Sequence, residues 1–126
     1  MTKRLICIFA VLLLACSPAL AVFRGVLSIS QPTTITLTNA SGNPGPASAT
    51  IFILCRGLTV ETLTAQIGTL AQFQVNLPKS TTRVIVELDV PNGTTTGVVT
   101  LQVTQADGTS FQDQVTQDAR FVYDVQ

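Results

Sequence analysis

Alternation of apolar and polar residues runs through most of this chain, and it limits what the chain can fold into. Residues 34–38 read Thr-Ile-Thr-Leu-Thr, and residues 72–77 read Gln-Phe-Gln-Val-Asn-Leu. Residues 99–104 repeat the pattern as Val-Thr-Leu-Gln-Val-Thr. A period of two places the apolar side chains on one face of an extended strand and the polar ones on the other. The chain is therefore predicted to be all-β, with strands that each bury one face.

Turn-forming residues separate these segments at intervals that suit short strands. Residues 39–46 combine Asn, Ser, Gly and Pro, and further turn signals stand at residues 78–81 and 91–93. Asp107-Gly108 predicts a hairpin with a type I′ turn, in which both residues have positive φ. About seven to nine short antiparallel strands at this spacing predict one small β-sandwich of immunoglobulin-like architecture.

Three segments give finer predictions. Residues 49–55 are apolar on both faces, so they suit a central strand, and Cys55 at their end is predicted to be a buried, inert thiol. Residues 58–62 predict a further strand, whereas residues 63–70 are ambiguous and include a possible helical turn. Asp113 shares a face with Phe111 and Val115, and an inward charge of this kind is typical of an edge strand.

The first residues have the pattern of an export signal. Lys3 and Arg4 precede an uncharged apolar run over residues 5–15, and residues 19–21 supply small side chains as Ala-Leu-Ala. A positive start, a short apolar core and such a site are typical of a cleaved signal peptide. We expect removal of residues 1–21 and a domain over residues 22–126. The predicted location is outside the cell, in the periplasm or in the cell envelope.

A second interpretation of the same segment gives a lipid anchor. Leu13-Leu14-Ala15-Cys16 resembles a bacterial lipoprotein signal, in which Cys16 is lipidated and becomes the first residue. Acyl chains would then hold the protein at a membrane, so the location depends on this choice. Simple secretion is favoured, because the middle position of such signals is usually a small residue rather than Leu14.

Residues that carry chemistry are scarce. The chain has no histidine, which removes the commonest general base and the commonest metal ligand. Cys55 is the one cysteine after residue 21, and no Gly-rich phosphate loop is present. Glu61 and Glu87 are the only glutamates, so the choice for a pair of catalytic carboxylates is narrow. We expect no catalytic function and no cofactor.

Charged ligands are not predicted either. Residues 22–126 carry a small excess of acidic side chains and no basic stripe, so nucleic-acid binding is not expected. Asp and Asn side chains could supply oxygen ligands to Ca²⁺, but their spacing fits no ordered calcium loop, and they are interpreted as turn and edge residues. The acids concerned are Asp89, Asp107, Asp113, Asp118 and Asp124. Asn39 and Asn92 begin glycosylation sequons.

Two functions fit this composition. The first is a secreted or envelope-anchored, non-catalytic module that acts in extracellular binding or surface structure, with an unidentified protein or surface partner. The Thr arrays at residues 34, 36, 38 and 94–96 are its candidate binding face. The alternative is a subunit of an extracellular fibre or coat, which self-assembles by strand exchange through residues 25–30.

Overall fold

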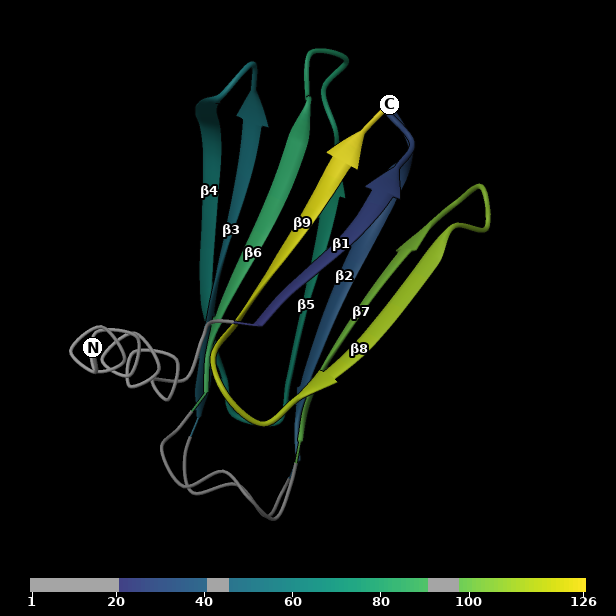
Figure 1. The fold of residues 1–126 in the computed structure, drawn as a ribbon. Coiled ribbons are helices and arrows are strands. Elements are labelled where there is room, and N and C mark those ends of the chain that lie inside the picture. Colours follow the sequence, from purple (N-terminus) through teal and green to yellow (C-terminus); the bar gives the residue numbers. More distant parts are fainter. Residues whose placement is uncertain (1–20, 41–45, 91–97) are drawn as a thin grey trace, which may run out of the picture.

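Each alternating segment forms a strand, and the strands lie in two packed sheets (Figure 1). The computed structural model describes residues 21–40, 46–90 and 98–126, and within them it has nine strands and no helix. The strands are β1 (Ala21–Leu27), β2 (Pro32–Asn39), β3 (Ala47–Cys55), β4 (Leu58–Ile67), β5 (Leu70–Asn76), β6 (Arg83–Asp89), β7 (Val99–Gln105), β8 (Ser110–Val115) and β9 (Ala119–Val125). The predicted all-β, sandwich-like fold is confirmed.

The two sheets share the strands unequally. One sheet, called sheet A, has the order β1-β9-β6-β3-β4, and the other, sheet B, has the order β5-β2-β7-β8. The apolar side chains of both sheets meet between them, and Leu37, Ile51 and Phe121 are 0% exposed. Burial of each such side chain contributes about 1.5–3 kcal/mol. The apolar residues of the alternating segments therefore form this core, and the polar residues between them form the two outer faces.

One strand pair departs from the predicted antiparallel arrangement. β1 pairs with β9 in parallel, with Ala21 opposite Ala119 and Leu27 opposite Val125. Parallel neighbours need a long connection, and here almost the whole domain lies between them in sequence. The ring of Phe23 stacks on that of Phe121, with centroids 4.9 Å apart, so the first strand shares the core with the last one.

A sharp crossover separates β1 from β2. Ser30 has a φ of 64°, and the chain passes here from sheet A to sheet B. The Gln105 side chain on β7 holds this crossover. Its Oε1 accepts a hydrogen bond from the Ser28 amide at 2.9 Å, and its Nε2 donates to the Ser28 carbonyl and the Thr33 hydroxyl, each at 3.0 Å. This buried amide therefore stabilises the turn between β1 and β2.

The type I′ turn forms at a different hairpin from the one predicted. Arg56 and Gly57 have φ values of 53° and 83°, the pair of positive angles that a type I′ turn requires, and they join β3 to β4. At the predicted turn of that type, positive φ is found at Gly108 with 97° but not at Asp107. The amide of Gln105 donates to the carbonyl of Thr109 at 2.8 Å, which closes a longer loop between β7 and β8.

The β3–β4 hairpin corrects two further predictions. Residues 63–70 contain no helical turn, because β4 continues to Ile67 as a strand of ten residues. Cys55 is half-buried rather than buried. It pairs with Leu58, which is 72% exposed, at a tip that extends past the core, and the register shift between Ile53 and Leu54 lies beside it.

Gly25 allows β1 to lie against the core. A Cβ at this position would stand 2.9 Å from the Phe111 ring on β8 and 3.0 Å from the Tyr123 ring on β9. Those two rings contact each other, with centroids 5.4 Å apart. The side chain of any other residue would therefore displace an aromatic ring or the strand itself.

We expect Gly25→Ala to lower the free energy of unfolding by about 1–3 kcal/mol, the usual cost of overpacking a filled site. Gly68→Ala is the matched control, because a Cβ there has nothing within 4 Å. Urea denaturation of the three proteins measures the effect. Equal stability of the two variants would contradict this account of Gly25.

Candidate binding face

The outer face of sheet B carries almost only uncharged polar side chains, and we call it the Thr/Gln face. Because inward and outward residues alternate, its members follow from the strand register. Its residues are Pro32, Thr34, Thr36 and Thr38 on β2, Leu70, Gln72, Gln74 and Asn76 on β5, Thr100, Gln102 and Thr104 on β7, and Ser110, Gln112 and Gln114 on β8. Pro32 and Leu70 are its only apolar members.

Short and long side chains are largely separated on this face. Thr predominates on the two central strands, where Thr34 lies opposite Thr104 and Thr38 opposite Thr100. Four of the five Gln side chains of the face lie on the edge strands β5 and β8, and the fifth, Gln102, lies on the central strand β7 opposite Thr36. Neighbouring strands are about 4.8 Å apart, so the two margins stand about 14 Å apart. The face therefore resembles a shallow trough with amide margins and a floor of Thr side chains that Gln102 interrupts.

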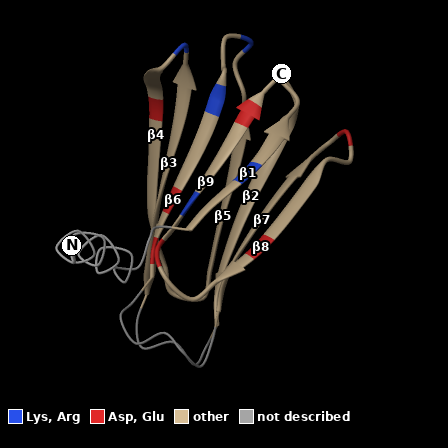
Figure 2. Cartoon of the chain, in the orientation of Figure 1, with Lys and Arg blue, Asp and Glu red and all other residues tan. Residues whose placement is uncertain are grey.

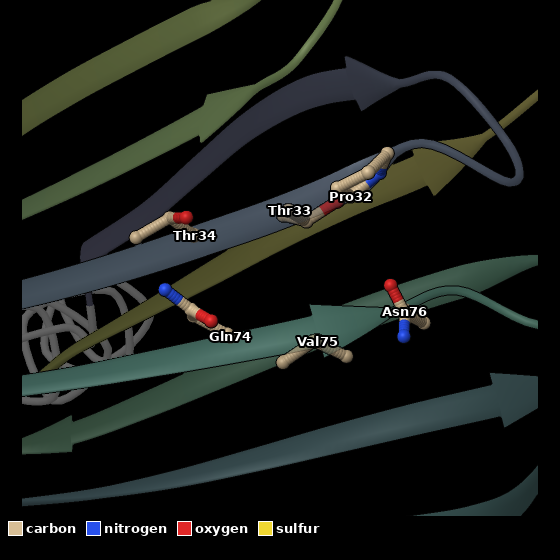
Figure 3. Close-up of a pocket in the computed structure, with 6 residues that line it drawn as sticks. All are labelled: Pro32, Thr33, Thr34, Gln74, Val75 and Asn76. Atoms are coloured by element: carbon tan, nitrogen blue, oxygen red, sulfur yellow. The ribbon is translucent and has the colours of Figure 1, made fainter.

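The structure contains a hollow at one end of the Thr/Gln face, between β2 and β5. Its volume is about 340 Å³, and Pro32, Thr34, Gln74 and Asn76 of the face help to line it (Figure 3). Thr34 and Gln74 lie directly opposite each other in the register. One residue pair along, the Gln72 amide donates to the Thr36 hydroxyl at 3.3 Å. Hydroxyl and amide groups thus supply both donors and acceptors here.

Charge distinguishes the two outer faces (Figure 2). Strands β2, β5 and β7 have no charged residue, and the one on β8, Asp113, lies opposite buried Leu101 on the inner side. The outer face of sheet A instead bears two ion pairs, between Arg83 and Asp124 at 3.1 Å and between Arg120 and Glu87 at 2.7 Å. The Thr/Gln face is accordingly suited to a neutral ligand.

The acids considered as metal ligands serve as separate structural groups. Asp118 Oδ1 accepts from the Val90 amide at 2.9 Å, and Asp107 Oδ1 accepts from the Thr109 amide at 3.0 Å. Hydrogen bonds from the backbone and the side chain of Thr109 lower the pKa of Asp107. Within residues 21–40, 46–90 and 98–126, no three His, Cys, Asp or Glu side chains are grouped as metal ligands would be.

The two glutamates are not brought together. Glu61 on β4 lies opposite Ile53, and Glu87 on β6 lies opposite Thr50, so β3 separates them and their side chains leave opposite faces of sheet A. Glu87 is also paired with Arg120. This arrangement offers no carboxylate pair for the acid and base roles of a glycosidase.

Asn39, the first residue of one glycosylation sequon, lies in the core. It is 4% exposed, and its Nδ2 donates to the Ile67 carbonyl at 3.1 Å. A glycan on this nitrogen would require the end of β2 to open. Outside the described residues lie Asn92, the Thr residues at 94–96, and residues 1–20 of the predicted signal segment 1–21, with Cys16 among them. The described part of the chain has no helix of the length and apolarity that crossing a membrane requires.

Tyr123, the only tyrosine in the chain, is sealed between the sheets. It is 1% exposed, and its hydroxyl has no hydrogen-bond partner among the described residues. Burial, together with the negative charge of Asp113, raises the pKa of Tyr123 above its ordinary value of 10.0. The native fold therefore holds this phenol neutral under conditions that would ionise it in the unfolded chain.

We expect the folded protein to lose stability as the pH rises above about 10, by up to about 1.4 kcal/mol per pH unit from this residue. The sign follows because the unfolded phenol releases its proton first. Near-ultraviolet absorbance reports tyrosinate, and Tyr123→Phe, which lacks this term, is the control. Ionisation near pH 10 with the fold intact, as judged by circular dichroism, would contradict the prediction.

Comparison of this chain with protein-family models, curated proteins and solved structures gives no match.

Proposed function

We propose that this chain is an exported, non-catalytic β-sandwich module of immunoglobulin-like architecture that binds a neutral extracellular ligand through its Thr/Gln face. The observation that carries the proposal is the continuous uncharged polar surface over all four strands of sheet B. The signal pattern of residues 1–21 supports export.

The strand order supports the immunoglobulin-like assignment. In variable-type immunoglobulin domains, one sheet has the order G-F-C-C′. The order β9-β6-β3-β4 in sheet A agrees with this, and β2 and β5 lie together in the facing sheet. The hairpin of β7 and β8, placed in the chain between β6 and β9, is an addition to that plan, and it supplies half of the Thr/Gln face.

The chemistry of the face favours a hydroxyl-rich neutral polymer, and we assign it to the polysaccharide class. A charged ligand would find no opposite charge on the Thr/Gln face, and an apolar ligand would find only Leu70 and Pro32. Hydroxyl and amide groups can exchange hydrogen bonds with sugar hydroxyls along the trough. No aromatic side chain belongs to this face, so we expect weak binding per site, with a Kd of about 1 mM, strengthened where sites repeat.

Binding to insoluble polysaccharides tests this function. Protein made from the full chain should be depleted from solution by at least one of cellulose, chitin, starch granules and insoluble β-glucan. The bound fraction should be nearly constant from about 0.05 to about 1 M salt, because no charges take part. Thr36→Lys places a long charged side chain on the floor of the trough, and we expect affinity to fall about tenfold or more.

Thr50→Lys is the matched control for this experiment. Thr50 lies on β3 and points outward from sheet A, so the substitution adds the same charge to the opposite outer face. It should leave the bound fraction unchanged. Absence of binding to all four polysaccharides, or equal losses in the two variants, would contradict the proposal.

Export is tested separately, by the intact mass of the protein in the medium and in the membrane fraction of its native host. We expect a soluble species that starts at Val22. A membrane-bound species that starts at an acylated Cys16 would replace secretion by lipid anchoring. The unprocessed chain in both fractions would contradict export.

A further inference from the structure

Exposed apolar side chains are confined to the edges of the two sheets. Among the described residues, the large apolar side chains that are exposed are Val22, Val26, Leu58, Val60 and Leu70, at 48%, 47%, 72%, 57% and 62%. They lie on β1 and β4, the two edge strands of sheet A, and on β5, an edge strand of sheet B. An exposed apolar edge is a place where another strand can pair.

The core is also partly open along both sides of the sandwich. On one side, Leu63 of β4 and Phe73 of β5 pack against the core but are only partly buried. On the other side, Phe23 of β1 and Phe111 of β8 do the same. Leu63 and Phe73 share one side of the sandwich, because the chain turns directly from β4 into β5 through residues 68–69. Phe23 and Phe111 share the other side, because Gly25 of β1 lies against the ring of Phe111 on β8. A neighbour on either side would complete the cover of these side chains.

Strand direction makes a second copy of this chain a suitable neighbour. In sheet A, β1 and β9 are parallel, whereas β9, β6, β3 and β4 are successively antiparallel. The strands β1 and β4 therefore run in opposite directions. If two copies stand side by side in the same orientation, β4 of one meets β1 of the next as an antiparallel pair, the arrangement with the stronger hydrogen bonds.

The two edges agree in length, and each carries one charged residue. β1 has seven residues, and the stretch of β4 beyond its bulge, residues 61–67, has the same length. Arg24 is the only charged residue on β1, and Glu61 is the only one on β4, so neither edge is highly charged. Neither strand contains Lys or Pro, the residues that commonly protect edges.

We infer that copies of this chain assemble laterally, with β4 of one copy pairing antiparallel with β1 of the next. The interface is heterologous, since it joins two different surfaces, so it leaves a free edge at each end and can grow. This is addition of an intact edge, not exchange of residues 25–30, because β1 stays on its own β9. The inference does not depend on any ligand of the Thr/Gln face.

Sedimentation velocity over a concentration series tests the assembly, using protein made from the full chain and two variants with blocked edges. Val22→Lys/Val26→Lys blocks β1, and Thr62→Lys/Thr64→Lys blocks β4. All four positions are exposed, so the fold should persist, as circular dichroism would check. The unaltered protein should form a series of species of increasing mass, and each variant alone should stay monomeric at a concentration at least tenfold higher.

Mixing the two variants gives the decisive result. Each retains the edge that the other lacks, so an equimolar mixture should form dimers and nothing larger. Thr50→Lys, one strand inside the edge, should assemble like the unaltered protein. The inference is overturned if the unaltered protein is monomeric at all concentrations or if the mixture stays monomeric. It is also overturned if the variant with the blocked β1 still assembles alone, which is the result expected of strand exchange.

Discussion

The buried side-chain amide of Gln105 forms hydrogen bonds that hold the two sheets in place relative to each other. Gln105, on β7 of sheet B, bonds to both the amide and the carbonyl of Ser28, and to Thr33 on the far side of the crossover. This is where the chain leaves sheet A and enters sheet B. Removing the amide would leave the half-buried backbone N–H and C=O of Ser28 without these partners, and each such loss costs up to about 1–3 kcal/mol. This contact fixes the crossover that follows β1, at the end of the parallel β1–β9 pair.

The alternation of the sequence was sufficient to predict the strands but not their partners. It predicted that Phe73 and Val75 face inward and that Asp113 lies on an edge strand, since each depends only on the local period of two. It failed at β1, because parallel pairing with β9 depends on contacts across the whole domain. It also failed at Cys55, because burial there depends on how far the hairpin extends past the core.

Only part of the Thr/Gln face could be predicted from the sequence. The outward Thr residues of β2 were evident from the pattern, as were the outward Gln residues of β5 and β7. These residues form one uncharged surface only because β5, β2, β7 and β8 are neighbours in sheet B. No local sequence pattern predicts that strand order. The ion pairs of sheet A show the same limit, because Arg83 and Asp124 are far apart in the chain and adjacent in the fold.

The parallel pairing of β1 with β9 has a mechanical consequence. Because both strands run the same way, the chain enters the described domain at one end and leaves it at the other (Figure 1). A pull on the two termini therefore slides β1 along β9 and loads all the hydrogen bonds between them at once. If the first and last strands were antiparallel, the same pull would instead break the hydrogen bonds between them one after another from one end. Resistance to force is thus built into the first and last strands of this domain.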